Sequence, residues 1–153
     1  MTAWLVKTEP STYAFQDLVR ERRTAWTGVK NALARRHLSA MAAGDAVVVY
    51  HSGDKEAVGL AEVARAAYPD AAGGAGAVAV DLVAGRNLER PVSLAELGAS
   101  APFAASPLLT QGRLSVLPLT AAQWKALLAL AARPAPGKAA PRKPARSKTA
   151  RRR

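Results

Sequence analysis

The sequence of 153 residues contains no cysteine and only two histidines. The absence of cysteine excludes disulfides, thiol nucleophiles and thiolate zinc sites. His37 and His51 are too far apart in the sequence to form a metal-binding pair on one helix. The sequence also lacks a phosphate-loop pattern and a dinucleotide-binding fingerprint. We therefore expect neither a metal site nor a cofactor.

Long apolar runs are missing as well. No stretch of about 18 consecutive apolar residues is present, so a membrane-spanning helix is not predicted. The residues Met1 to Lys7 have neither a basic leader nor a long apolar segment, so a signal peptide is not predicted either. The expected location is the cytoplasm, where association with the nucleoid would be compatible with the composition. The sequence contains no signal of oligomeric state.

Acidic residues are scarce, at 11 against 22 Lys and Arg, and the imbalance is confined to one end of the chain. Residues 1–132 hold 13 of the Lys and Arg and all 11 acidic residues, for a net charge of +2. Residues 133–153 hold the other 9 and no acid. This second segment has four prolines and no large apolar residue, so it cannot offset the entropy cost of folding. We predict a folded domain at 1–132 and a disordered basic tail at 133–153.

Basic tails of this kind bind polyanions, because each neutralised phosphate releases condensed counterions. The alternative is a tail that only improves solubility or binds an acidic protein. If nucleic acid is the partner, the expected phosphate ligands in the tail are Lys138, Arg142, Lys143, Arg146, Lys148, Arg151, Arg152 and Arg153.

Residues 1–132 are long enough for one buried core, and their pattern mixes both kinds of secondary structure. Short apolar or β-branched runs predict strands, and helical spacing with capping boxes predicts helices. Strands are expected at 3–7, 46–51, 57–67, 78–83 and 114–117, with 46–51 and 57–67 as an antiparallel pair, and helices at 15–22, at 31–41, from Leu94 and after Thr120.

Short strands with long connections, interrupted by helices that do not alternate regularly with them, do not fit a parallel sheet. They favour an α+β fold: a small, mainly antiparallel, partly closed β-barrel with peripheral helices.

Aromatic residues are few, with three Trp, three Tyr and two Phe. Trp4 and Trp124 lie in a predicted strand and on a predicted amphipathic helix face, which indicates core packing. Trp26 lies in a predicted loop, followed by Gly28, and is either a packing wedge or a platform on which a base stacks.

Five segments carry a further signal: 4–10, 26–31, 44–45, 50–52 and 113–116. Together they resemble, in order and spacing, the motifs of the EVE domain family. The resemblance implies a PUA-like barrel, related to the YTH readers of methylated RNA, that binds a modified base, chiefly modified cytosine in DNA, without catalysis. Thr8 stands where the family usually has Ser, Lys30 where Arg is frequent and Ala32 where a larger residue is common.

The side chains of these segments suit an extruded base. Such a base needs a stacking surface, partners for its edge and a grip on the nearby phosphate. Asn31 can donate and accept, although an Asn that opens a helix is equally suited to cap it. The expected base pocket is Trp26, Asn31, Tyr50, His51, Ser52, Lys7, Thr8 and Glu9, with Lys30, Arg35, Arg36 and Arg113 as phosphate ligands.

Two other functions have to be compared with this one. An enzyme fits the sequence less well, and an RNA-binding module fits it equally well. Neighbouring residues on a strand point to opposite faces, so His51 is badly placed to act as a general base for Ser52, and no nucleophile elbow surrounds Ser52. An enzyme is therefore not expected. RNA in place of DNA stays open as an alternative partner, in RNA modification or translation, because no feature of the sequence distinguishes a 2′-hydroxyl from its absence.

Overall fold

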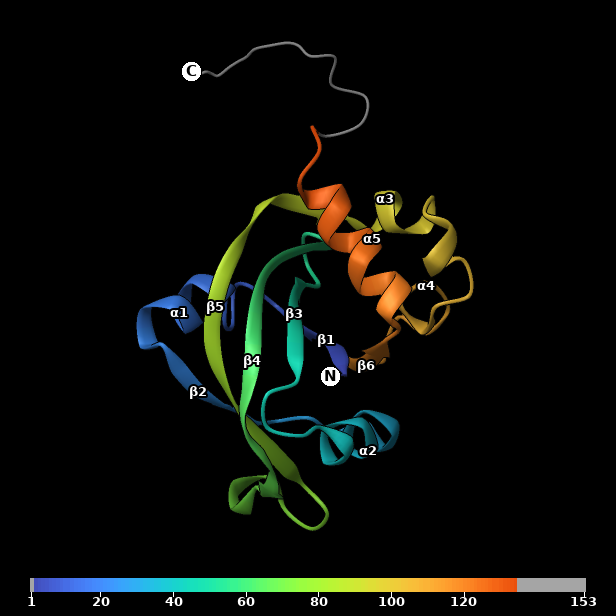
Figure 1. The fold of residues 1–153 in the computed structure, drawn as a ribbon. Coiled ribbons are helices and arrows are strands. Elements are labelled where there is room, and N and C mark those ends of the chain that lie inside the picture. Colours follow the sequence, from blue (N-terminus) through green and yellow to red (C-terminus); the bar gives the residue numbers. More distant parts are fainter. Residues whose placement is uncertain (1, 135–153) are drawn as a thin grey trace.

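The computed structural model describes residues 2–134. It is a mixed α+β structure built on one six-stranded sheet (Figure 1). The strands are β1 (Ala3–Thr8), β2 (Arg23–Trp26), β3 (Ala46–His51), β4 (Glu56–Pro69), β5 (Val78–Ser93) and β6 (Val116–Leu119). The helices are α1 (Phe15–Glu21), α2 (Ala32–Ala40), α3 (Leu94–Gly98), α4 (Pro107–Thr110) and α5 (Ala121–Ala131), with short 3₁₀ turns η1 (Ala71–Gly73) and η2 (Ala101–Phe103).

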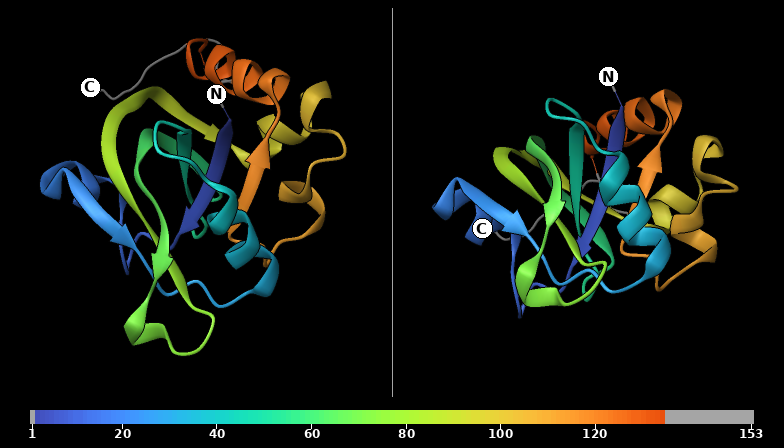
Figure 2. Two further views of the ribbon diagram at one scale, coloured as in Figure 1. Left: turned by 60° about the horizontal axis from the view of Figure 1, so that its bottom comes forward. Right: turned by 90° about the horizontal axis from the view of Figure 1, so that it is seen from below.

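The strand order is β2-β5-β4-β3-β1-β6, and all neighbouring pairs are antiparallel except β1 with β3. The two outer strands, β2 and β6, are not paired with each other within residues 2–134. The sheet is strongly curved (Figure 2), but it is open because these two strands do not pair. The predicted partial closure into a barrel is therefore wrong. β2 pairs only with β5 and β6 only with β1, so within residues 2–134 the ring of hydrogen bonds that a barrel needs is interrupted between these two edges.

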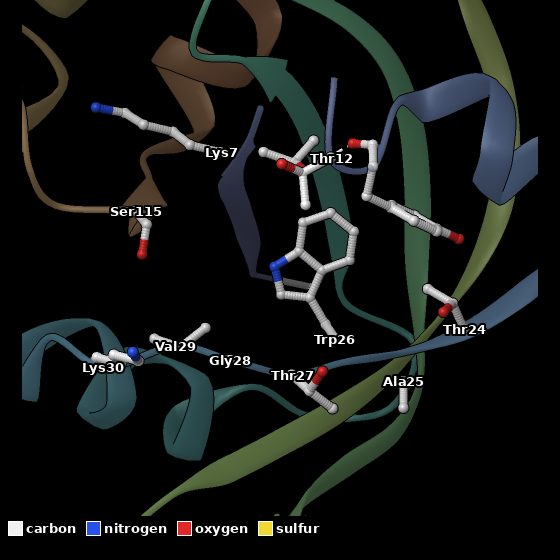
Figure 3. Close-up of a pocket in the computed structure, with 12 residues that line it drawn as sticks. Lys7, Thr12, Thr24, Ala25, Trp26, Thr27, Gly28, Val29, Lys30 and Ser115 are labelled. Carbon is white, nitrogen blue, oxygen red and sulfur yellow. Dashed lines mark hydrogen bonds between the residues drawn. The ribbon is translucent and has the colours of Figure 1, made fainter. Parts of the chain in front are cut away.

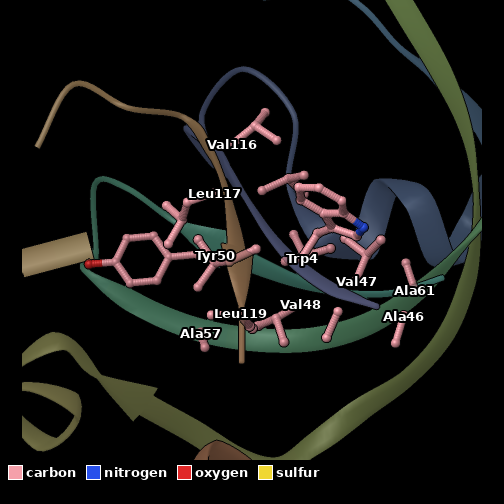
Figure 4. Packing of buried hydrophobic residues seen from close by; sticks show 14 of the residues in the cluster. Trp4, Ala46, Val47, Val48, Tyr50, Ala57, Ala61, Val116, Leu117 and Leu119 are labelled. Carbon is pink, nitrogen blue, oxygen red and sulfur yellow. The ribbon is translucent and has the colours of Figure 1, made fainter. Parts of the chain in front are cut away.

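The core is formed by side chains from all six strands and from the helices that pack on the sheet. β3 carries the run Ala46 to Tyr50, which is buried throughout, so it reads as an apolar run and not as an alternation. Trp4 lies in this cluster as predicted, and its indole nitrogen donates to the buried carboxylate of Asp45 at 2.9 Å. Figure 4 shows Trp4 and Tyr50 at opposite ends of the same apolar cluster.

β4 and β5 are longer than the sequence predicts and form one curved hairpin, whose connection lies at the opposite end of the molecule from α5 (Figure 1). Tyr68 and Pro69, expected in a flexible connection, belong to β4. The register shifts at several points along the pair. At one of them Gly59 lies against the Phe15 ring, where a Cβ would approach within 2.2 Å. Glycine here makes room for α1 against the sheet.

The helix caps follow the sequence signals. Ser93 caps α3 by accepting from the Glu96 amide, and Thr120 with Gln123 forms the expected capping box of α5. Asn31 caps α2, since its side-chain oxygen accepts from the Ala34 amide at 2.9 Å. α2 packs on β4, β5 and β6, and α5 packs on β5 and β6.

The end of α5 is fastened to β5 by Arg90. Its guanidinium donates to the carbonyls of Leu130 at 2.8 Å and Arg133 at 2.5 Å, and it pairs with Glu96 at 2.8 Å. The predicted domain boundary at Ala132 coincides with the C-cap of α5. The predicted disordered tail lies outside the described residues from 135 onward, so that prediction stays a prediction. In the described part of the chain, no helix has the length and apolarity to cross a membrane.

Candidate nucleic-acid interface

A cavity of about 480 Å³ opens where the sheet fails to close. It is lined on one side by β2 and on the other by the end of β1 and Ser115, the residue directly before β6. The residues that line it share small hydroxyl or apolar side chains, with two lysines and no carboxylate (Figure 3): Lys7, Thr8, Thr12, Tyr13, Thr24, Ala25, Trp26, Thr27, Gly28, Val29, Lys30 and Ser115.

The end of β1 supplies two of the predicted site residues. The Thr8 hydroxyl donates to the Tyr13 carbonyl at 2.7 Å, which holds the connection to α1 over the cavity. Lys7 donates from Nζ to the Gly112 carbonyl at 3.2 Å, and burial lowers the pKa of its ammonium. Glu9 is exposed and does not line the cavity, because its carboxylate turns back to accept from the Ser11 amide and hydroxyl.

Trp26 is the last residue of β2, although the sequence predicts a loop at this position. It is 8% exposed, belongs to the core and also lines the cavity, so the two readings of this residue are not exclusive. The Tyr13 ring meets the Trp26 ring edge to face, with centroids 6.0 Å apart and planes at 84°. In Figure 3 the indole of Trp26 extends into the middle of the lining residues, with Thr12 beside it. The pair forms an aromatic corner of the cavity.

Residues 27–31 connect β2 to α2, and residues 27–30 of this connection form a second wall. Gly28 has φ +77°, a conformation that side-chain-bearing residues rarely adopt, and it turns the chain after Trp26. Val29 is buried in the core, and Lys30 beside it is exposed. Asn31 does not line the cavity, because its oxygen is committed to the α2 cap.

The end of β3 does not line the cavity, although Tyr50, His51 and Ser52 were predicted to do so. Tyr50 is 3% exposed within the core. His51 accepts at Nε2 from the Phe15 amide at 3.0 Å, and its Nδ1 lies 3.8 Å from the Asp54 carboxylate. Ser52 lies in the exposed turn after β3, and its amide donates to the Thr8 carbonyl at 2.9 Å. These three residues hold the fold beside the cavity.

The predicted phosphate ligands divide in the same way. Lys30 lines the cavity, and exposed Arg113 follows Gly112, whose carbonyl holds Lys7. Arg36 is exposed on α2, whereas Arg35 is half-buried and donates to the Val29 carbonyl at 2.8 Å. The tail ligands from Lys138 onward lie outside the described residues.

Seven lining side chains were not predicted from the sequence: Thr12, Tyr13, Thr24, Ala25, Thr27, Val29 and Ser115. Of these residues, only Tyr13 carries a usable signal in the sequence. An aromatic residue in a polar turn shortly after a strand is as unusual as Trp26 in a predicted loop. The hydroxyl residues have no distinguishing signal, because Ser and Thr are common in turns and on edge strands.

The chain thus forms a small α+β domain with an open, curved sheet and a cation-lined cavity beside an aromatic corner. The family model of the EVE domain matches residues 2–130 of this chain. The chain belongs to the EVE domain family.

Known proteins with related sequences or structures support this assignment. The mouse thymocyte nuclear protein 1 is 30% identical, over 83% of this chain and 72% of the mouse protein. A structure of a Rhodopseudomonas palustris protein, determined by NMR, is 41% identical with a TM-score of 0.80, over 86% of this chain and 93% of that one. The human THYN1 protein, in a crystal structure with DNA containing 5-methylcytosine, is 28% identical with a TM-score of 0.81, over 88% of this chain and 100% of that one.

The match to the full-length human relative covers a smaller part of both sequences. The human thymocyte nuclear protein 1 sequence is 36% identical to this chain over 80 residues, which is 44% of this chain and 36% of the human protein. The chain therefore aligns with about a third of that relative's length.

Proposed function

We propose that this domain binds DNA and holds a modified base, chiefly a modified cytosine, in the cavity beside Trp26. The observation that carries the proposal is the cavity itself, which combines an aromatic corner, hydroxyl groups and two cations without any carboxylate. A volume of about 480 Å³ is ample for a single base with part of its sugar. An extruded base needs this combination of a π surface, hydrogen-bonding groups and a phosphate grip.

The relatives support the choice of ligand. The human THYN1 structure contains DNA with 5-methylcytosine, and its fold agrees with this chain over most of both lengths. Transfer of the ligand is a proposal, because 28% identity permits a different cavity lining. RNA is the competing partner, and the experiment below includes it.

We infer that the domain is a reader and not an enzyme. His51 accepts a backbone hydrogen bond at Nε2, so that nitrogen is occupied and is not free to activate Ser52. The cavity also has no carboxylate to act as a general acid or base. A cytoplasmic location remains a prediction from the sequence.

The decisive experiment compares oligonucleotides that differ only in one base, plain or methylated, as DNA and as RNA. Thr12→Trp fills the cavity beside Trp26 from an exposed position, and Thr110→Trp adds the same bulk at the exposed end of α4. We expect Thr12→Trp to abolish the preference for the modified base and Thr110→Trp to retain it. Equal binding of plain and modified DNA by the wild-type protein would contradict the proposal.

Trp26→Phe is the milder test of the aromatic corner. Trp26 is a core residue, so its replacement by Ala would cost about 3–5 kcal/mol of stability and confuse folding with binding. Phe keeps an aromatic face with less stacking area. We expect a folded protein, checked by thermal melting, with a several-fold weaker preference for the modified base, because stacking is worth about 1–3 kcal/mol per base.

The basic tail is proposed to add affinity that does not depend on base identity. Residues 135–153 carry eight Lys and Arg. Their removal should reduce the slope of log K against log salt by about 4–7, if half or more of them contact phosphates, and leave the preference for the modified base intact. The truncation should keep Arg133, whose carbonyl accepts from Arg90. An unchanged salt dependence would favour the solubilising role instead.

A further inference from the structure

Arg35 is the half-buried arginine of α2, and its guanidinium donates to two backbone carbonyls. Nε donates to the Val29 carbonyl at 2.8 Å, and Nη1 lies 3.4 Å from the Ala75 carbonyl. Val29 belongs to the cavity wall at residues 27–30, and Ala75 belongs to the connection between β4 and β5. One side chain thus joins α2, the connection at 27–31 that precedes it and the connection between β4 and β5, which is distant in the sequence.

The two segments that Arg35 contacts have little regular structure of their own. Residues 27–31 form neither helix nor strand, and Gly28 has a positive φ. The connection between β4 and β5 contains Gly74 and Gly76, both with positive φ. Glycines in such conformations give a chain few local restraints. Hydrogen bonds from a rigid, always charged guanidinium are then a strong means of fixing both segments.

We propose that Arg35 is a positioning residue for base selection: it fixes the cavity wall at 27–30 through the Val29 carbonyl and braces that wall against the β4–β5 connection. This inference rests on the proposed function of the cavity. It replaces, for Arg35, the expected contact with phosphate, because two of its donor nitrogens are directed at carbonyls of the protein. Lys30, on the same wall, stays free to meet a phosphate.

The geometry explains why the effect should be on selection. Val29 and Lys30 line the cavity directly, so a shift of their backbone changes the shape that a base must match. Figure 3 shows Gly28, Val29 and Lys30 in line between Trp26 and α2, on which Arg35 lies. A loosened wall leaves the cations in place and keeps general attraction for nucleic acid, but it admits plain and modified bases alike.

Arg36 provides a matched control. It is the next residue on α2, has the same charge and is exposed, with no hydrogen bond or ion pair from its side chain to residues 2–134. Arg35→Ala and Arg36→Ala therefore remove the same charge from the same helix, and only the first removes the clamp. Arg35→Lys keeps the charge and can reach one carbonyl, but its single ammonium lacks the separate donors of the guanidinium.

The test combines binding of plain and methylated oligonucleotides, the salt dependence of that binding, and backbone hydrogen exchange. We expect Arg35→Ala to lower the preference for the modified base about tenfold, with the salt slope unchanged, and Arg35→Lys to restore part of the preference. Arg36→Ala should keep the preference and lower the salt slope by at most about one. Peptides covering 27–31 and 74–77 should exchange several-fold faster in Arg35→Ala and as in wild type in Arg36→Ala.

Contrary outcomes separate the two proposals. If Arg35→Ala lowers affinity for all oligonucleotides equally and reduces the salt slope, Arg35 is a phosphate ligand and the inference is overturned. Unchanged exchange at 27–31 would also overturn it. If the wild-type protein shows no preference for the modified base, the proposed function fails, and hydrogen exchange still decides whether Arg35 fixes the wall. Should Arg35→Ala not fold, Arg35→Lys gives the same comparison.

Discussion

The parallel strands β1 and β3 end side by side, with Lys7 opposite Tyr50 and Thr8 opposite His51, but only the end of β1 lines the cavity. β6 pairs with β1 only as far as Val6, so Lys7 and Thr8 extend beyond it, whereas Tyr50 and His51 of β3 are paired on both sides, with β1 and with β4. A polar residue at a strand end therefore reaches a ligand only where the neighbouring strand leaves space. At the end of β3 the same residue types are used to hold the structure.

Thr8 and His51 show how closely the two strand ends cooperate. The Thr8 hydroxyl donates to the Tyr13 carbonyl, and the His51 imidazole accepts from the Phe15 amide. Both bonds fasten the connection between β1 and α1, which carries Thr12 and Tyr13 to the cavity. One strand end shapes the cavity directly, and the other does so only through this connection.

The largest expected effect is that of Tyr50→Ala. Tyr50 is buried in the apolar cluster of Figure 4, so its truncation should lower the free energy of unfolding by about 3 kcal/mol. Tyr50→Phe should change it little, because the Tyr50 hydroxyl makes none of the side-chain hydrogen bonds within residues 2–134 and is not among the buried polar atoms without a partner, so it meets solvent. Urea denaturation measures both. If Tyr50→Phe abolished the preference for the modified base while remaining stable, the β3 end would be part of the site after all.

His51→Ala should have the next largest effect and lower the free energy of unfolding by about 1–3 kcal/mol. The buried Phe15 amide would lose its only acceptor among the described residues, which is the costly kind of hydrogen-bond loss. Thr8→Val removes the companion bond and should cost about 1 kcal/mol. Denaturation of the two single variants and the double variant tests their coupling. Strictly additive losses would argue against a shared role in holding the connection.

Lys7→Met should affect binding and leave stability nearly unchanged. Met keeps the apolar stem, and the half-buried ammonium is costly to desolvate, as its lowered pKa indicates. The slope of log K against log salt should fall by about one.

The pH dependence of binding offers a second test of Lys7. Because burial lowers the Lys7 pKa below that of an ordinary lysine, wild-type affinity should begin to fall with rising pH earlier than titration of ordinary lysines predicts. Only protonated Lys7 attracts a phosphate, so Lys7→Met should lack this early fall; an identical pH profile in both would contradict it.

The smallest effect belongs to Arg113→Ala. Arg113 is exposed, follows Gly112, whose carbonyl accepts from the cavity residue Lys7, and takes part in none of the ion pairs within residues 2–134. Affinity should fall a few-fold for plain and modified DNA alike at low salt, as measured by titration. Lys125→Ala, an exposed cation on α5, is the matched control and should have no effect. Equal losses in the two variants would show that overall charge alone acts.

Much of the fold was predictable because its signals are local. The β-branched run of β3, the Ser93 and Thr120 caps and the apolar start of β1 are each encoded within a few residues. β2 was missed because four residues with one Arg and one Thr carry too short an alternation to detect. The full length of β4 and β5 was missed because pairing with neighbours kept Tyr68 and Pro69 in the sheet against their turn preference.

The candidate site was predictable only in part for the same reason. Lys7, Thr8, Trp26 and Lys30 line the cavity, whereas Asn31 caps α2 and Tyr50 fills the core. Each residue has the chemistry that the sequence indicated. The groups that lie nearest decide which contact each side chain makes. A side chain that bonds to a helix amide or packs in an apolar cluster is then not available to a ligand.

Local patterns in the sequence account for the kinds of element, their caps, the concentration of positive charge in residues 133–153 and the motifs shared with the EVE domain family. The packing of the whole sheet accounts for the opening between β2 and β6 and for the contact of Tyr13 with Trp26 there. It also brings Arg35 to Val29 and Ala75. Periodicity and capping are set by neighbours in the chain, whereas the cavity is lined by residues as far apart in the sequence as Lys7 and Ser115.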